Sequence, residues 1–186
     1  MKTFGTSIVA SMIVVGCFAP HLKAGDREHL GKWHDGPRDM AAWYVCEKAD
    51  LDGCSEAGWS VFEGSCYAVS EELKSYDDAA AACEAQTAQL VSIQSAEENA
   101  HVQSLCKRRA CWLGLSEPAD SENWFWADGA PGGTKGKWVG YVNWEKGEPN
   151  NYFGRDEEAT FLNFWGHLGV PPPEQQEMMQ TKRGVE

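Results

Sequence analysis

Basic residues, long apolar runs and closely paired cysteines are all scarce in this sequence, and each scarcity disfavours a class of protein. Only 16 Lys and Arg stand against 28 Asp and Glu, a formal charge of −12 at pH 7, so we expect no nucleic-acid partner. The apolar run from Ile8 to Ala19 is shorter than the roughly 20 residues that cross a bilayer, so we expect no membrane span. No two cysteines have the C-x₂-C spacing of structural zinc sites.

A catalytic motif is also missing. No Ser or Cys lies in a pattern that would make it a nucleophile, and the acidic pairs are explained by solvent or by metal binding. The histidines are scattered along the chain: His21, His29, His34, His101 and His167. We therefore expect that the protein is not an enzyme.

Tryptophan, glycine and cysteine are abundant instead, with nine, nineteen and seven residues in a chain of 186. This composition is typical of a loop-rich fold with aromatic anchors and disulfides. Lys2 and the apolar run after it predict a secretory signal peptide over residues 1–24, with an uncleaved N-terminal anchor as the alternative. Cleavage after Ala24 removes Cys17 and leaves six cysteines, an even number that indicates disulfides in a secreted, extracellular protein.

The rest of the chain divides into three parts. Residues 25–52 lack an apolar period and carry Gly and Pro, so we expect an N-terminal leader that packs loosely or not at all. Residues 53–168 form the predicted domain, which opens with a β-hairpin that turns at Glu63-Gly64. Residues 169–186 have no strand pattern, and we expect a disordered tail there.

Two helices are predicted inside the domain. Ser75 can cap the first helix, which we expect to continue to Gln89. Two aspartates follow in its first turn, where their charge interacts favourably with the helix dipole. Its small and apolar residues fall at helical spacing, which points Cys83 toward the core. Ser95 and Glu98 have the S-x-x-E spacing of a capping box and begin the second helix.

Beyond Cys111, short runs rich in Trp and Gly predict short strands and long loops of the kind that bind ligands. From the first hairpin onward, the motifs follow in this order: C-x₁₁-C around Gly58-Trp59, the helix with Cys83, Leu90-Val91-Ser92-Ile93, Trp112-Leu113-Gly114-Leu115, Trp126-Ala127-Asp128-Gly129, Asn143-Trp144 and Glu148-Pro149-Asn150. In this order and spacing they make residues 54–165 resemble a C-type lectin-like domain.

This resemblance implies a disulfide-stapled α+β fold in which two helices flank small antiparallel sheets and a long loop forms the ligand surface. Trp112 would then pack in the core. Trp126 and Trp144 would hold the long loop in place, with an exposed indole that stacks on a sugar as the alternative.

The family also suggests a role for Glu148-Pro149-Asn150. In members with this motif the Glu and the Asn bind Ca²⁺ and hydrogen-bond two neighbouring sugar hydroxyls, and a cis Pro149 would turn both side chains the same way. Glu-Pro-Asn accompanies mannose, N-acetylglucosamine and fucose, whereas Gln-Pro-Asp accompanies galactose. For Glu-Pro-Asn the alternative is an ordinary surface turn. Glu157 is the best candidate for a third metal ligand, with Asp156 and Glu158 beside it and a solvated charge run as the alternative. A second calcium could draw on Glu117, Asp120 and Glu122, although their spacing does not match that of the family.

The match fails after Glu157. The family continues with Trp-Asn-Asp, which supplies the last two side-chain ligands, and then with two closing cysteines, but none of these follows here. One missing disulfide has lost both halves, since Ala159 stands where its first cysteine belongs. Cys83, however, would lose its partner, and the missing C-terminal strand would expose a sheet edge.

The six cysteines allow fifteen pairings in principle. We expect a disulfide from Cys54 to Cys66, which closes the hairpin, and one from Cys106 to Cys111. The remaining two, Cys46 and Cys83, could pair with each other, stay free, or link two chains into an oligomer.

Two functions follow from these features. The first is a calcium-dependent carbohydrate-binding protein for mannose-type glycans, with weak calcium affinity because the Trp-Asn-Asp ligands are missing. The second is a metal-independent protein-interaction module on the same fold, in which sugar binding has been lost.

Overall fold

The computed structural model describes residues 29–163 apart from 50–53, 55–56, 120 and 153–155. The predicted signal peptide (1–24) and the predicted tail (169–186) lie outside these residues. Within them the elements are, in chain order, β1 (Trp33–Gly36), β2 (Trp43–Lys48), β3 (Trp59–Phe62), β4 (Ser65–Val69), α1 (Tyr76–Glu84), β5 (Gln89–Leu90), α2 (Ala96–Cys106), β6 (Cys111–Ser116), β7 (Trp124–Phe125), β8 (Pro131–Thr134), β9 (Lys137–Trp138) and β10 (Ala159–Leu162).

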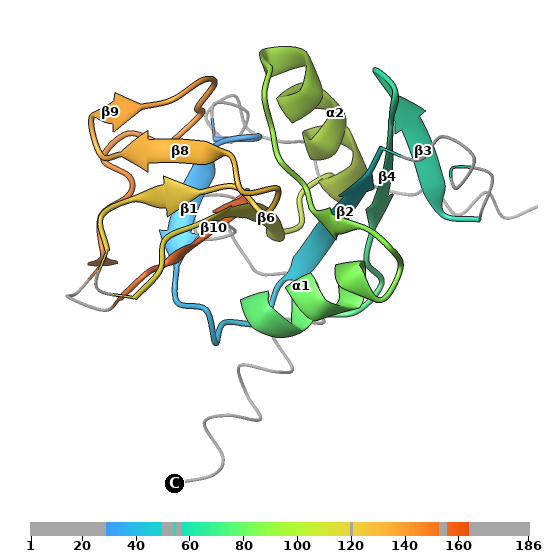
Figure 1. Ribbon diagram of the computed structural model, residues 1–186, viewed down its shortest axis with the longest axis horizontal. Helices are drawn as coiled ribbons and strands as arrows, with labels where there is room; N and C mark the ends of the chain where they lie inside the picture. The colour runs from blue at the N-terminus through green and yellow to red at the C-terminus, as the bar shows by residue number, and fades with distance from the viewer. Residues whose placement is uncertain (1–28, 50–53, 55–56, 120, 153–155, 164–186) are drawn as a thin grey trace, which may run out of the picture.

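A mixed sheet organises the fold (Figure 1). Its strands follow the order β3-β4-β2-β6-β7-β8-β9, with β5 paired to β2 and with β10 between β1 and β6. Both helices contact β2, and α2 also contacts β4. The predicted α+β fold with two helices is confirmed, but the sheet is not purely antiparallel because β2 and β6 run parallel.

Local sequence signals explain the hairpin and the starts of the helices. Glu63 and Gly64 have φ angles of 46° and 91°, as a tight turn between two twisted strands requires. The hydroxyl of Ser75 accepts a hydrogen bond from the backbone N–H of Asp78, 3.2 Å away, at the start of α1. At the start of α2 the hydroxyl of Ser95 accepts one from the N–H of Glu98 at 3.0 Å.

The first helix is shorter than predicted. It ends at Glu84 rather than Gln89, because the chain turns back through Thr87, whose φ angle is 55°, and enters β5. The side chain of Cys83 faces the core and is fully buried, as the helical spacing predicts. In the part of the chain that the structure describes, no helix is long and apolar enough to cross a membrane.

The tryptophans hold the long loop against the sheet. Trp112 lies in the core with no exposed surface, and Trp126 retains only 4% of its surface. Trp144 is half-buried, and its ring centroid lies 5.3 Å from that of Trp124 and 5.2 Å from that of Trp138. Edge and tilted ring contacts of this kind add to the hydrophobic gain of burying the rings.

The expected leader is wrong for the described part of residues 25–52. Strands β1 and β2 fall inside it, and β2 lies in the centre of the sheet, where it pairs with β4, β5 and β6. Trp33 and Val45 are fully buried. The sequence analysis missed these strands because a strand buried on both faces shows no polar and apolar alternation.

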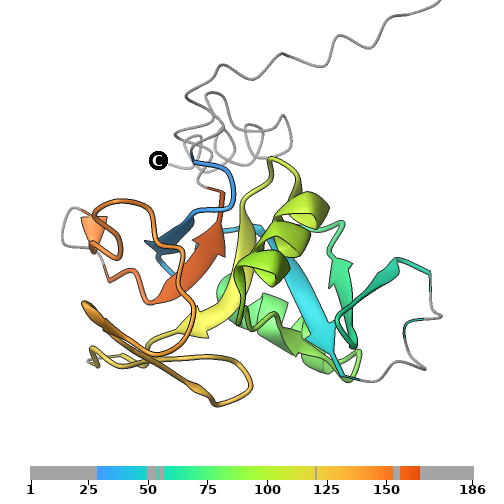
Figure 2. The same cartoon turned by 90° about the horizontal axis from the view of Figure 1, so that it is seen from above.

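The expected exposed sheet edge is also wrong. Strand β10 pairs with β6 on one side and with β1 on the other, with Trp33 opposite Leu162 and Gly36 opposite Ala159. Figure 2 shows β1 and β10 side by side although they come from opposite ends of the described chain. The N-terminal segment therefore occupies the place that the sequence analysis left empty at the C-terminal end.

Buried amides fasten this N-terminal segment to the domain. The N–H of Gly31 donates to Oδ1 of Asn163 at 2.7 Å, and the N–H of Asn163 donates to the carbonyl of Lys32 at 3.1 Å. On α2, Asn99 accepts from the indole N–H of Trp33 at 2.7 Å and donates to the carbonyl of Gly31 at 3.1 Å. Because these groups are buried, separating the segment from the domain would leave several of them unpaired.

The disulfides complete the attachment. Cys54 pairs with Cys66 and Cys106 pairs with Cys111, as expected. Cys46 on β2 pairs with Cys83 on α1, so the structure uses both cysteines within one chain. Of the three alternatives left open for these cysteines, the structure has the first, a disulfide with each other.

Trp33→Ala should lower the free energy of unfolding by about 3–5 kcal/mol, the range for removing a large buried aromatic ring. The Trp33 ring centroid lies within 6 Å of those of Trp126, Tyr141 and Trp144, at 5.6, 5.7 and 5.9 Å. Urea denaturation followed by circular dichroism measures the change. Val61→Ala, on a side chain that is 60% exposed, is the matched control and should stay within about 0.5 kcal/mol of wild type. Equal, small effects of the two changes would contradict the burial of β1.

Candidate functional site

The Glu-Pro-Asn motif lies in the long loop that leads from β9 to β10. The peptide between Glu148 and Pro149 is cis, and the preceding Gly147 has a φ angle of 103°, which favours glycine. Pro149 is buried and its carbonyl accepts a hydrogen bond from the ammonium group of Lys135. The motif is thus anchored by its middle residue.

Strand β1 meets this motif. One carboxylate oxygen of Asp35, Oδ2, accepts hydrogen bonds from the backbone N–H groups of Asn150 at 2.8 Å and Asn151 at 3.0 Å. Nδ1 of His34 lies 3.2 Å from Oε1 of Glu148. Two residues of the N-terminal segment therefore contact the loop in which the sequence analysis placed the site.

A cavity of about 470 Å³ opens at this junction. Its lining includes the three side chains predicted as metal ligands, which are Glu148, Asn150 and Glu157, and the structure adds His34 and Asp35 to them. We call this the junction cavity. It brings together groups that are more than one hundred residues apart in the sequence.

Glu157 is held beside the motif by backbone hydrogen bonds. Its Oε2 accepts from the N–H of Tyr152 at 2.6 Å, and its own N–H donates to Oδ1 of Asn151 at 3.1 Å. These contacts fix the position of the Glu157 carboxylate on one wall of the junction cavity.

Burial governs the protonation of the β1 side chains. Burial is the largest cause that raises the pKa of Asp35 from 3.8 to about 6, and the neighbouring carboxyl group of Glu148 adds to it. Burial likewise lowers the pKa of His34 from 6.5 to about 4, so its ring is neutral at pH 7. Oδ1 of Asp35 and Oε2 of Glu148 are buried and have no hydrogen-bond partner, which is costly for carboxylate oxygens.

These oxygens are suited to a hard cation. Among residues 29–163 that are described, no group of three or more His, Cys, Asp or Glu side chains is arranged to hold a metal ion as it stands. The chemistry of the junction cavity nevertheless fits Ca²⁺, since the carboxylates of Asp35, Glu148 and Glu157 and the amide oxygen of Asn150 are all oxygen donors. A bound cation would satisfy the buried oxygens that lack partners.

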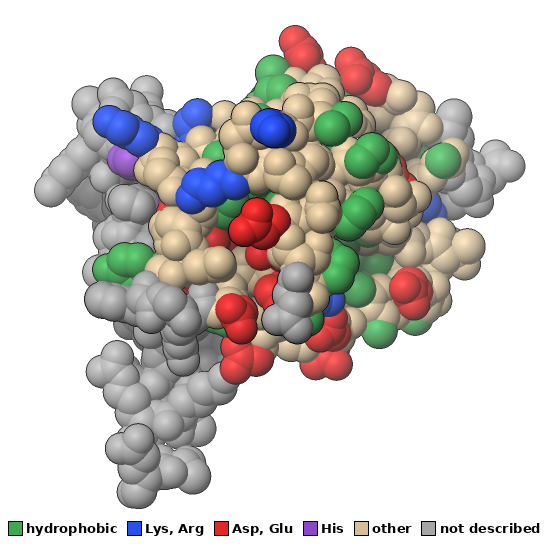
Figure 3. All heavy atoms as spheres, turned by 60° about the vertical axis from the view of Figure 1, so that its left-hand side comes forward, with side chains coloured by type: hydrophobic (Ala, Val, Ile, Leu, Met, Phe, Trp, Pro, Cys, Tyr) green, Lys and Arg blue, Asp and Glu red, His purple; other side chains and the backbone are tan. Residues whose placement is uncertain are grey.

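A second, smaller cavity of about 340 Å³ shares Asp35 and Asn150 with the first. Glu117 and Glu122 also line it, whereas Asp120 lies outside the described residues. Burial and, after it, the neighbouring Glu158 raise the pKa of Glu117 to about 7. Figure 3 shows acidic side chains gathered beside basic ones on the face that carries β8 and β9.

Comparison with known proteins agrees with this architecture. Residues 72–159 match the family model of the lectin C-type domain. Residues 72–159 are therefore a C-type lectin-like domain. No solved structure matches the chain significantly.

Curated relatives show the same similarity. The chain is 41% identical over 104 residues to the CD209 antigen-like protein A of Mus musculus, and these residues cover 55% of this chain and 42% of the relative. It is 38% identical over 110 residues to the CD209 antigen of Symphalangus syndactylus, covering 58% and 28%, and 39% identical over 114 residues to the human C-type lectin domain family 17, member A, covering 61% and 28%. The chain spans less than half the length of these relatives.

His34 and Asp35 are the site residues that the sequence analysis missed. The Trp-Asn-Asp of the family was expected after Glu157, whereas Trp33-His34-Asp35, which differs from that motif by one residue, precedes the rest of the domain. Ten residues after Gly36 comes Cys46, which supplies the partner that Cys83 needs. The signal that points to His34 and Asp35 is therefore the Trp33-His34-Asp35 motif itself.

The raised pKa of Asp35 predicts how stability depends on pH without calcium. Because the folded-state pKa, about 6, lies above the ordinary value of 3.8, folding favours the protonated form; this contribution is present below pH 4 and is lost as the pH rises through 6. Asp35→Asn should remove that loss and raise the free energy of unfolding at pH 7 by up to about 2–3 kcal/mol. Urea denaturation at pH 4 and pH 7 in chelator measures it.

Asp39→Asn is the matched control, because Asp39 lies on the same connection between β1 and β2 and is exposed. It should leave the pH dependence of wild type unchanged. If Asp35→Asn keeps the wild-type dependence as well, the burial of the Asp35 carboxyl is contradicted.

Proposed function

We propose that this protein is a secreted, calcium-dependent lectin for glycans with mannose, N-acetylglucosamine or fucose. The observation that carries the proposal is the junction cavity, in which Glu148, Asn150 and Glu157 meet Asp35 and in which two carboxylate oxygens are buried without a partner. The three intrachain disulfides support secretion, since disulfides persist in oxidising compartments.

Each side chain has a distinct part in sugar binding. Bound Ca²⁺ would supply coordination positions for two neighbouring hydroxyls of the sugar. The Glu148 carboxylate accepts a hydrogen bond from one hydroxyl, and the Asn150 amide nitrogen donates one to the other. Asp35 holds the backbone of Asn150 and Asn151 by its Oδ2, which leaves Oδ1 as the oxygen that would hold the metal.

The calcium-loaded site should prefer sugars with a pair of equatorial hydroxyls. The reason is that the acceptor on Glu148 and the donor on Asn150 follow each other along the loop in the order found in Glu-Pro-Asn lectins. The protein should be retained on a mannose resin in calcium and released by chelator. Glu148→Gln with Asn150→Asp should exchange that retention for retention on a galactose resin, with at least about a tenfold change in relative affinity, which corresponds to about 1.4 kcal/mol.

The matched control for this exchange is Glu84→Gln with Asn123→Asp, which makes the same chemical changes at exposed positions that do not line the junction cavity. Its preference for mannose should be that of wild type. Retention of the unchanged protein on mannose in chelator would contradict the calcium mechanism.

His34 should weaken calcium binding. It stands where the family has Asn, and a neutral imidazole offers a nitrogen where Ca²⁺ prefers oxygen. His34→Asn should therefore tighten calcium binding by about tenfold, because it adds one oxygen ligand. Calorimetric titration with calcium measures this change.

The matched control is His29→Asn, which replaces a histidine that does not line the junction cavity and should leave the affinity unchanged. Equal affinities of wild type and His34→Asn would place residue 34 outside the metal's coordination sphere.

A second function, a metal-independent protein-interaction module, is favoured by one observation. In the described residues the acidic side chains are not arranged to hold a metal as they stand, and His34 occupies a ligand position. The same calorimetric titration separates the two functions, because this module would show no heat of calcium binding at any concentration up to several millimolar, the weak end of extracellular calcium sites.

A further inference from the structure

The junction cavity has a polar end and an apolar wall. Glu148, Asn150 and Glu157 make the polar end, and the apolar wall consists of Pro37, Met40, Tyr152 and Phe161. At about 470 Å³, the cavity lies in the size range of pockets that hold drug-sized ligands. The groups proposed to bind the sugar occupy only one end of this space.

Two aromatic residues shape the wall. Phe161, 2% exposed, forms its base: a side chain at Gly36 would place its Cβ 2.7 Å from Cε1 of Phe161, so the glycine allows the ring to pack against β1. Phe161 stacks on His34, with the ring centroids 5.8 Å apart. Tyr152, which also lines the cavity, is 62% exposed and so offers a large aromatic surface to a ligand.

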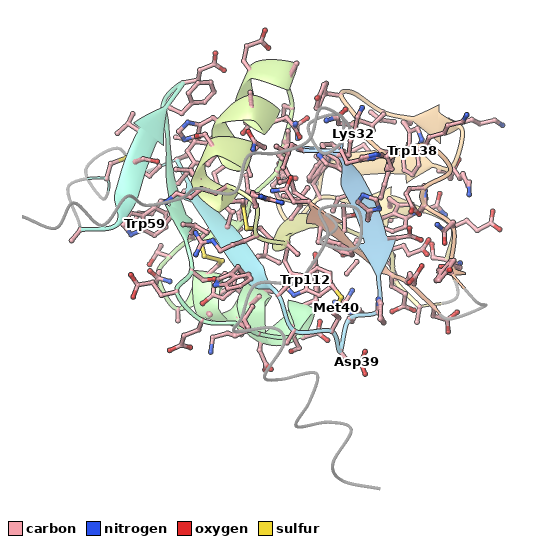
Figure 4. All side chains as sticks on the ribbon, turned by 180° about the vertical axis from the view of Figure 1, so that it is seen from behind. Lys32, Asp39, Met40, Trp59, Trp112 and Trp138 are labelled. Atoms are coloured by element: carbon pink, nitrogen blue, oxygen red, sulfur yellow. A yellow bond between two sulfur atoms is a disulfide. The ribbon has the colours of Figure 1, made fainter. Side chains whose placement is uncertain are left out.

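The connection between β1 and β2 holds Met40 in the wall. Met40 packs against the buried cluster that contains Trp112 and Phe161, and Figure 4 shows it close to Trp112. Its N–H donates to the carbonyl of Pro37 at 3.0 Å. A methionine thioether is apolar and adapts its shape to what it contacts, which suits a surface that receives a variable group.

Contacts with α1 make this connection rigid. The guanidinium of Arg38 pairs with the carboxylate of Asp77 and lies 4.5 Å from the ring centroid of Tyr76. The N–H of Tyr76 donates to the carbonyl of Arg38 at 2.9 Å. Because the wall is formed before a ligand arrives, less ordering entropy is lost on binding.

From this arrangement we propose that the junction cavity binds sugars that carry an apolar aglycone, with the sugar on Glu148 and Asn150 and the aglycone against Pro37, Met40 and Tyr152. The inference rests on the proposed function, because the polar end fixes where the sugar lies. It adds a ligand class, glycosides with an aromatic or alkyl group on the anomeric oxygen, which the Glu-Pro-Asn motif does not specify. Burial of two to three methylene equivalents against the wall should tighten binding by about tenfold or more.

The test compares phenyl α-mannoside with methyl α-mannoside by calorimetry on the full chain in calcium. In wild type, the phenyl glycoside should bind about tenfold more tightly. Met40→Ser should bring the ratio of the two affinities closer to one and leave the affinity for methyl α-mannoside unchanged, because it removes apolar surface from the wall without adding a charge beside the carboxylates. Val139→Ser, which makes the same kind of change on a side chain that is 50% exposed and outside the cavity, should keep the wild-type ratio.

Tyr152→Ser provides a second measure that does not depend on the packing of Met40, because its side chain is largely exposed. It should also reduce the ratio. A ratio near one in wild type, with normal binding of methyl α-mannoside, would overturn the inference and leave the proposed function intact. Absence of calcium-dependent binding of methyl α-mannoside would overturn the proposed function and the inference together.

Discussion

The pairing of β1 with β10 is the interaction on which both the fold and the site depend. It covers the edge of β10 that β6 leaves open and inserts Trp33 among the aromatic rings of the long loop. The Cys46–Cys83 disulfide then ties the following strand, β2, to α1. A segment that precedes most of the domain in sequence thus completes its sheet, its core and its covalent framework.

The same pairing explains the chemistry of the junction cavity. Strand β1 carries Asp35 into contact with the loop that bears Glu148 and Asn150, where burial raises the pKa of Asp35 and leaves carboxylate oxygens without partners. Such an arrangement is unfavourable by itself and becomes favourable when a cation supplies the opposite charge. The connection after β1 adds the apolar wall at Met40, so one short segment contributes to both ends of the cavity.

The sequence predicted the parts of the fold that depend on local signals. The hairpin turn at Glu63-Gly64, the caps at Ser75 and Ser95 and the buried face of Cys83 follow from neighbouring residues, and the structure has them. The placement of residues 29–49 could not be predicted in this way, because it is decided by long-range pairing and by burial on both faces of a strand. For the site, the loop ligands follow from a motif, whereas Asp35 reaches them only through the pairing of β1 with β10.

The central claim is that β1 and the Glu-Pro-Asn loop form one calcium-binding unit. Backbone amide NMR shifts of the full, isotope-labelled chain during a calcium titration test it most directly. The account predicts that the amides of Asp35 and Gly36 shift together with those of Asn150 and Asn151, and that all four saturate at the same calcium concentration. Shifts that stay within residues 148–157, with no change at 33–36, would contradict it.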